Sequence, residues 1–175
     1  SMSPNSFEQD AEWLKTLADV ETTKALGSLP SDDKVQDTLD MVREYVKEAQ
    51  MHGEVLFMDQ RQLLTFGYIR DVALVWEYEK KLLMDKALSS DVAYFEPFYR
   101  DLAARRFSLI ISDPLRAPIK DSDYQFGEEN NAWVKWVAIP VLCYYEPIKT
   151  VPEFRLQLLV PAQDSKDCSH SLPEE

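Results

Sequence analysis

Glycine is scarce in this sequence, and its glycines are widely separated. The dinucleotide-binding fingerprint and the phosphate-binding loop both need clustered glycines for close backbone approach, so the chain has neither. No serine lies in a G-x-S-x-G motif, which argues against a hydrolase of the common triad type. The two histidines, His52 and His170, are far apart, which argues against a histidine-based metal site or acid–base pair. The four glycines are Gly27, Gly53, Gly67 and Gly127.

Basic residues and long apolar runs are also lacking. The 19 lysines and arginines stand against 31 acidic residues, which gives a net charge of -12. Nucleic acid and anionic membrane surfaces both need a basic face, so we expect neither as the main partner. The longest hydrophobic run, Val137 to Tyr145, is interrupted by Pro140 and is far below the roughly 20 residues that span a bilayer. No signal peptide is visible, and because Ser1 precedes Met2 we expect Ser1 to be a remnant of tag removal and the chain to be a piece of a larger protein.

The two cysteines do not make a disulfide framework. Cys143 lies among aromatic residues and is predicted to be a small buried apolar side chain, whereas Cys168 lies in a polar segment. A bridge between the two is the less favoured alternative.

The composition is that of a folded chain, since apolar residues make up 45% of it and aromatic residues 11%. Its central feature is the short apolar run that Gly53 opens and Asp59 closes, which is typical of a strand buried on both faces of a parallel sheet. An amphipathic helix is predicted before it, with Ser31 as its N-cap. Apolar residues at steps of three and four form the stripe of that helix: Val35, Leu39, Val42, Val46 and Ala49.

Further elements are predicted along the chain. The best second strand is 107–112, which ends at Asp113, and a shorter candidate is 72–75. Helices are expected over 78–88 and from about Glu96 to Ala104, with Pro97 in the first turn. Asn130 or Asn131 is expected to cap a short helix that carries two tryptophans. Segments 141–146 and 154–160 are predicted as an antiparallel pair of strands at a sheet edge.

These elements predict a Rossmann-like three-layer α/β domain over residues 31–161. We expect about five strands, mostly parallel with an antiparallel C-terminal pair, and helices on both faces of the sheet. Residues 1–30 are predicted to be an N-terminal helical extension, and residues 162–175 a disordered tail.

Asp59 and Asp113 are the main candidate site residues. Both stand just beyond the carboxyl ends of expected parallel strands, where α/β sheets place their ligand crevices. Two carboxylates there suit a Mg²⁺ ion or shared acid–base catalysis. The favoured interpretation is that each caps the next turn, because no lysine, glycine loop or third acid follows at a recognisable spacing. Arg61 and Arg70 are candidate partners of either acid.

Two other groups are weaker candidates. The aromatic residues near the C-terminus would suit a platform for a sugar or lipid-linked ligand, although aromatics at this spacing more often form core. Residues 128–131 would suit Ca²⁺ but lack the spacing of a known calcium loop, so a solvated loop is favoured. The sequence therefore assigns no catalytic residue, no metal and no cofactor. The aromatic candidates are Trp133, Trp136, Tyr144 and Tyr145.

Three stretches in order carry a resemblance to a known family: Gly53-Glu54-Val55-Leu56-Phe57-Met58-Asp59, then Phe107-Ser108-Leu109-Ile110-Ile111-Ser112, then Trp136-Val137-Ala138-Ile139-Pro140-Val141-Leu142-Cys143-Tyr144-Tyr145-Glu146-Pro147. This order resembles the soluble domain that follows the membrane helices of bacterial polytopic glycosyltransferases of the GT-C type, whose donors are polyprenyl-phosphate sugars. The resemblance covers roughly residues 30 to 160.

The resemblance implies a non-catalytic accessory domain on the extracytoplasmic face of a bacterial membrane. The catalytic carboxylates of that family lie in loops between membrane helices, so none is carried over to a position of this chain. The implied partners are the membrane-embedded part of its own parent chain and a glycan or lipid-linked sugar. Two alternatives follow from the residues: a stand-alone cytoplasmic enzyme that uses Asp59 and Asp113 with a divalent ion, and an acidic protein-interaction module.

Overall fold

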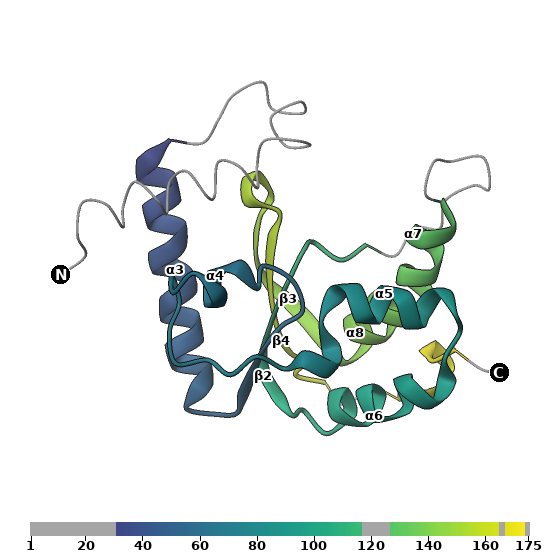
Figure 1. The fold of residues 1–175 in the computed structure, drawn as a ribbon. Helices are drawn as coiled ribbons and strands as arrows, with labels where there is room; N and C mark the ends of the chain where they lie inside the picture. The colour runs from purple at the N-terminus through teal and green to yellow at the C-terminus, as the bar shows by residue number, and fades with distance from the viewer. Residues whose placement is uncertain (1–30, 117–126, 165–166, 174–175) are drawn as a thin grey trace.

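A mixed sheet forms the centre of the molecule, with helices on both of its sides (Figure 1). The structure is a computed structural model that describes residues 31–116, 127–164 and 167–173. The strand order is β1-β2-β4-β3, in which β1 and β2 are parallel and β4 is antiparallel to both β2 and β3. The strands are β1 (Glu54–Phe57), β2 (Phe107–Ser112), β3 (Tyr145–Val151) and β4 (Leu156–Pro161).

The predicted α/β class and the antiparallel C-terminal pair are confirmed, and the strand count and the mostly parallel order differ from the prediction. The described residues form four strands rather than about five, and the parallel pair lies at one edge of the sheet. The predicted strand at 72–75 is irregular chain that leads into the short helix η1 (Trp76–Tyr78). This four-residue apolar run carries no ladder partner, which shows that β-propensity alone does not place a strand in a sheet.

Helix α3 (Asp32–Gln50) covers one face of the sheet, as its sequence predicts. Ser31 caps it, because its side-chain oxygen accepts a hydrogen bond from the Lys34 backbone N–H at 3.2 Å. The five apolar residues of the predicted stripe are all buried. They pack against alternate residues of the strands, including Val55 and Phe57. Side chains spaced for one face of a helix and side chains spaced for one face of a strand therefore form one hydrophobic cluster.

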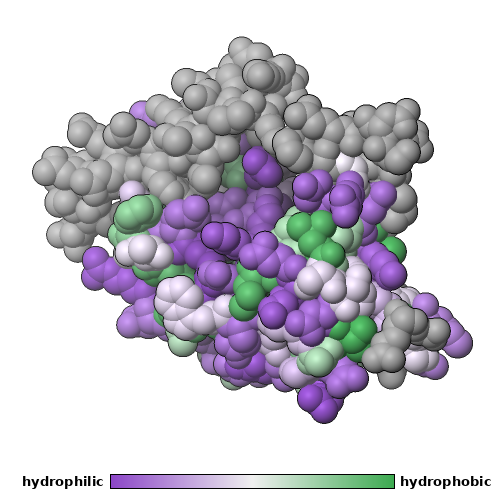
Figure 2. All heavy atoms as spheres, turned by 45° about the vertical axis from the view of Figure 1, so that its right-hand side comes forward, coloured by the Kyte–Doolittle hydropathy of each residue, from purple (hydrophilic) through white to green (hydrophobic). Residues whose placement is uncertain are grey.

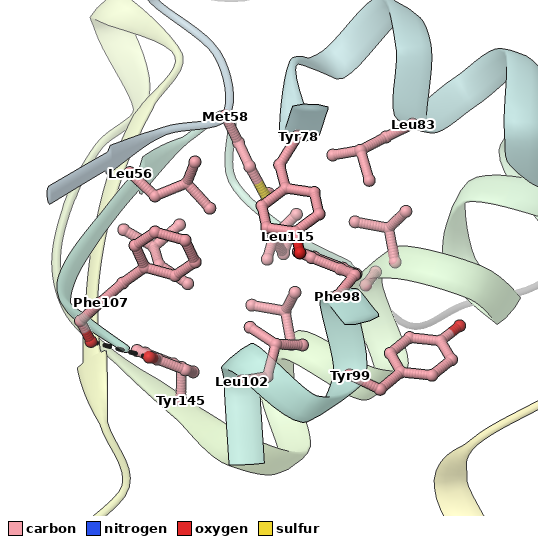
Figure 3. Close-up of a cluster of buried hydrophobic side chains, with 14 of the residues drawn as sticks. Leu56, Met58, Tyr78, Leu83, Phe98, Tyr99, Leu102, Phe107, Leu115 and Tyr145 are labelled. Carbon is pink, nitrogen blue, oxygen red and sulfur yellow. Dashed lines mark hydrogen bonds between the residues drawn. The ribbon is translucent and has the colours of Figure 1, made fainter. Parts of the chain in front are cut away.

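The opposite face carries the larger hydrophobic cluster, into which Leu56 and Met58 point (Figure 3). At its base Tyr145 is fully buried, and its hydroxyl donates a hydrogen bond to the Phe107 carbonyl oxygen at 2.7 Å. The hydroxyl therefore has a partner and adds no unsatisfied polar group to the core. Three helices supply much of this cluster: α5 (Lys80–Leu88), α6 (Val92–Ala103) and α8 (Ile139–Tyr144).

The segment 141–144, predicted as the start of a strand, is helical. The chain runs through α7 (Gly127–Trp133), a π-helical turn η2 (Val134–Ala138) and α8 before β3 begins. Pro140 has no N–H to donate to the Trp136 carbonyl, and the Tyr99 hydroxyl donates to that oxygen instead, at 2.8 Å. A short apolar run does not distinguish a buried helix from a strand, which explains the error. Asn130 and Asn131 lie inside α7 and do not cap it.

Helix α6 also begins earlier than predicted. Asp91 caps it by accepting a hydrogen bond from the Tyr94 N–H at 3.0 Å, so Pro97 lies in the helix interior and not in its first turn. Gly67 follows Phe66, the C-cap residue of α4 (Gln62–Thr65), and has a φ of 76°, which glycine adopts without steric cost.

A disulfide joins Cys143 to Cys168, with the two Cα atoms 6.0 Å apart. The prediction of two unbridged cysteines was therefore wrong. Residues 162–164 and 167–173 of the predicted tail are described in the structure, and Cys168 of the bridge lies among them. Cys168 is only 2% exposed, and the Ala162 N–H donates to the Tyr144 carbonyl oxygen at 2.9 Å. The short helix η4 (Ser169–Ser171) follows the bridge. The predicted N-terminal extension, 1–30, lies outside the described residues.

Candidate functional site

The carboxyl ends of β1 and β2 bring Asp59 and Asp113 together. The Ile111 carbonyl oxygen accepts hydrogen bonds from the Met58 and Asp59 N–H groups at 3.0 and 3.4 Å, so the parallel pairing continues to the end of both strands. Lys80, the first residue of α5, lies between the two acids. Its Nζ is 3.0 Å from Asp59 Oδ2 and 2.6 Å from Asp113 Oδ2. The sequence correctly predicts that the acids share one edge of the sheet, but it does not predict the lysine between them.

Arg155 is the second cation of this cluster. Its Nη2 lies 3.1 Å from Asp113 Oδ2, the same oxygen that Lys80 contacts. Arg155 follows η3 (Pro152–Phe154) with a φ of 51°, in the turn between β3 and β4. Gln60 joins this turn to the end of β1, because its side-chain amide donates to the Arg155 carbonyl oxygen at 3.2 Å. The two carboxylates therefore meet two cations, and we call these four side chains the acid–base cluster: Asp59, Lys80, Asp113 and Arg155.

The two acids of the cluster have different proton affinities. Burial, together with the neighbouring Asp59 carboxylate, raises the pKa of Asp113 to about 6, although Lys80 opposes the shift. Burial also raises the pKa of Asp59, but hydrogen bonds with Asp113, Lys80 and the Gln60 N–H outweigh it and hold that pKa below its ordinary value. For Lys80, burial lowers the pKa, and the two carboxylates outweigh this and raise it. Near neutral pH Lys80 is therefore a fixed cation and Asp59 a fixed anion.

These shifts predict a pH dependence of stability. The pKa of Asp113 is raised from 3.8 to about 6 in the folded state, so the folded chain binds more protons than the unfolded chain between these values. We therefore expect the free energy of unfolding to fall as the pH rises from about 4 to about 6, by at most about 1.4 kcal/mol per pH unit. Urea titrations across this range measure it. Asp113→Asn should flatten the slope and the exposed Asp164→Asn should keep it, and an unchanged slope in Asp113→Asn would contradict the assignment.

A groove of about 640 Å³ opens beside Asp59 and Lys80. Trp76 lies on its wall with 65% of its surface exposed, and the Arg61 guanidinium lies over the indole, 5.0 Å from the ring centroid. Arg61 Nη1 contacts Glu79 Oε2 at 3.0 Å, while Nε and Nη2 are buried without a hydrogen-bond partner among the described residues. The groove thus combines an exposed aromatic ring with fixed donors and acceptors. Its other walls come from Met58, Gln62, Thr65, Leu74, Lys81, Met84 and Asp85.

The predicted pairing of the arginines with the acids was wrong for the contacts that the structure describes. Arg61 pairs with Glu79, and the Arg70 Nε donates to the Gly67 carbonyl oxygen at 3.4 Å. Arg61 nevertheless lines the same groove as Asp59. Its role in ligand binding stays a prediction.

The predicted aromatic platform near the C-terminus does not form. Trp136 is 3% exposed and packs in the core with its ring 5.1 Å from Phe95, and Tyr145 is buried with it. Trp133 is half-buried and lies beside the acid–base cluster, with its ring centroid 6.0 Å from Lys80 Nζ. The exposed aromatic ring beside the acids is Trp76.

The stretch 128–131, considered for Ca²⁺, is part of α7 and not a solvated loop. Within residues 31–116, 127–164 and 167–173, no group of three or more His, Cys, Asp or Glu side chains is placed to hold a metal ion. A helical segment separates its side chains by rotation, so four consecutive polar residues do not converge on one point.

Sequence reasoning missed the groups that determine the character of the site: Lys80, Arg155, Glu79 and Trp76. Lys80 follows Glu79 at the start of a helix and looks like one member of an exposed charged run, Glu77 to Lys81. Trp76 stands at the edge of the same charged run, and tryptophan, although highly buried on average, is rarely buried completely because it is large. Arg155 carries no local signal, since it reaches Asp113 only through the pairing of β4 with β2.

The comparisons with known proteins found no match to this chain. No protein-family model matches it, no curated protein is similar enough to match, and no solved structure matches its fold. None of the helices in the described ranges has both the length and the apolar composition needed to cross a membrane.

Proposed function

We propose that this chain is a non-catalytic accessory domain of a membrane glycosyltransferase-like protein, exposed on the extracytoplasmic face and in contact with substrate. The observation that carries the proposal is the acid–base cluster. Lys80 and Arg155 lie against the carboxylates that a metal-dependent or acid–base reaction would use. The two carboxylates make charge-assisted hydrogen bonds with the Lys80 ammonium, which lies between them where a bridging metal ion would have to bind.

Two further observations support the proposal. The Cys143–Cys168 disulfide is a bond that persists in oxidising compartments and is rare in the reducing cytosol. The stretches Gly53–Asp59, 107–112 and 136–147 resemble the soluble domains of GT-C glycosyltransferases in order and character. A Rossmann-like ancestry of the sheet belongs to the same proposal, because the parallel β1–β2 pair keeps the acids at the carboxyl edge.

Topology mapping of the complete gene product tests the proposal. We expect the protein in the membrane fraction, and alkaline phosphatase fused after the domain to be active, because that reporter needs an oxidising compartment for its disulfides. The control is a fusion that an added N-terminal segment keeps in the cytoplasm, where the reporter should be inactive. A gene product found in the cytosolic fraction, or an inactive alkaline phosphatase fusion, would overturn the proposal.

The metal-dependent enzyme is the second candidate. The raised pKa of Asp113, about 6, favours it, because a carboxyl with such a value can exchange protons near neutral pH. An enzyme of this kind would be stabilised by Mg²⁺ or Mn²⁺, and Asp59→Asn would abolish the effect. Our proposal predicts no shift of the melting temperature with either ion, because Lys80 Nζ lies between the two carboxylates.

The third interpretation, an acidic interaction module, predicts a large exposed apolar patch. Figure 2 shows hydrophilic side chains interspersed with smaller hydrophobic areas over the described residues of one face. That face offers a mixed polar surface, which agrees better with the binding of a small hydroxyl-rich ligand than with a hydrophobic protein contact.

A further inference from the structure

We infer that the groove beside Asp59 and Lys80 binds a neutral sugar, with one face of the sugar ring stacked on Trp76. The inference deepens the proposed accessory role, and it rests on that role for the compartment in which the protein would encounter the sugar. The inference rests on the groove, on the exposed indole and on the balance of charge around them.

The shape and polarity of the groove suit a small ligand. Its volume of about 640 Å³ lies in the range of small-molecule sites. A pyranose ring has an apolar C–H face and a rim of hydroxyl groups, and the walls offer a matching pair of surfaces. The apolar wall is made by Trp76, Leu74 and Met84.

Trp76 is exposed to solvent in the groove. An indole exposed by 65% leaves a large apolar surface in water, and burial of that surface is favourable by roughly 25 cal/mol per Å². Arg61 lies over the ring at 5.0 Å and restricts its orientation. A ligand that covers the indole therefore gains contact area without first having to order this side chain.

The charge of the groove decides between neutral and anionic ligands. A phosphate or another anion would meet three carboxylates as well as three cations, so the site has no net attraction for it. Hydroxyl groups both donate and accept, and they can use the acidic and the basic side chains together. The acidic side chains are Asp59, Glu79 and Asp85, and the basic ones are Arg61, Lys80 and Lys81.

Arg61 has unused hydrogen-bonding capacity within the described part of the chain. Its Nε and Nη2 atoms are buried without a partner among the described residues, and such donors carry a desolvation cost. A ligand hydroxyl that reaches them after a small shift of the guanidinium over Trp76 would remove that cost. This makes Arg61 the main polar contact that we expect, with Glu79 as the acceptor beside it.

NMR titration of the whole chain with two neutral glycosides, methyl β-D-glucopyranoside and methyl α-D-mannopyranoside, tests the inference. We expect saturable shifts of the Gln62 and Lys81 backbone amides, which line the groove, with a dissociation constant on the order of 1 mM for at least one glycoside. Trp76→Ala should weaken this binding about tenfold or more. Met51→Ala, which removes a side chain exposed outside the groove, should leave it unchanged.

Inorganic pyrophosphate serves as the anionic probe in a parallel titration. Saturation by pyrophosphate without saturation by either glycoside, no saturable shift up to about 100 mM glycoside, or equal binding by Trp76→Ala would each overturn the inference. These outcomes are separate from those of the topology experiment, which does not involve the groove. A cytosolic gene product that still binds glycosides through Trp76 would overturn the accessory role alone.

Discussion

Replacing Cys143 and Cys168 together by serine is expected to lower the free energy of unfolding by about 3.5 kcal/mol. The bridge closes a loop with a sequence separation of 25, and closing a loop of this length removes that amount of conformational entropy from the unfolded chain. The loop contains both C-terminal strands, β3 and β4, so its closure restricts the part of the chain that completes the sheet.

Urea denaturation of the wild-type chain and the double serine variant measures the effect. For a chain of this size we expect the melting temperature to fall by about 10 °C as well. Dithiothreitol should lower the stability of the wild-type chain to that of the variant and should not affect the variant. Equal stability of the wild-type chain with and without reductant would contradict the prediction, and so would the detection of two free thiols in the native protein.

The same bond links the fold to the compartment. A chain that depends on the bridge for several kcal/mol loses a large fraction of a typical domain's stability when it is reduced. Cytosolic thiol systems keep such cysteines reduced, whereas extracytoplasmic compartments allow the bond to form. The expected sensitivity to reductant therefore agrees with the extracytoplasmic location that we propose.

The elements that local sequence could predict are those with a strong period. The stripe from Val35 to Ala49 predicts α3 because steps of three and four residues place all of it on one side of a helix. The run from Val55 to Met58 predicts β1 because both faces of that strand are buried, one against α3 and the other in the larger core cluster. The two acids were paired correctly for a related reason, since parallel strands end at a common edge.

The elements that local sequence could not predict depend on distant contacts. Lys80 is 21 residues from Asp59 and 33 from Asp113, and Arg155 is 42 from Asp113, so no local pattern joins them. The π-helical turn and α8 occupy a run that is as apolar as a strand. The hydrogen bond that the Tyr99 hydroxyl donates to the Trp136 carbonyl oxygen stabilises the helical alternative. The pairing of Cys143 with Cys168 likewise depends on the position of a segment that has no periodic signal of its own.

Replacing Lys80 by methionine is expected to lower the free energy of unfolding by about 3 kcal/mol at about pH 8. The change keeps most of the length and of the apolar part of the side chain and removes the charge between two carboxylates that are 25% and 18% exposed. The value lies at the low end for a broken buried pair, because Lys80 itself is 37% exposed and water screens part of the interaction. Arg155 keeps its contact with Asp113, so Asp59 is the acid that loses its ammonium partner entirely.

The size of this loss is expected to depend on pH in a defined direction. Without Lys80 the pKa of Asp113 rises further above its unfolded value, so the folded variant takes up a proton more readily as the pH falls. The difference between the variant and the wild-type chain should therefore be smaller at about pH 5 than at about pH 8. The double variant Lys80→Met/Asp113→Asn should recover part of the stability at the higher pH, because it removes one of the two opposed carboxylates.

Urea titrations of the four chains at both pH values measure these differences. Lys81→Met is the matched control, since Lys81 is an exposed neighbour on the same helix and its replacement should change stability by no more than about 0.5 kcal/mol. A Lys80→Met variant as stable as Lys81→Met at both pH values would show that water already solvates and screens the two carboxylates. The acid–base cluster would then have no structural role, and the carboxylates would again be free to serve a reaction.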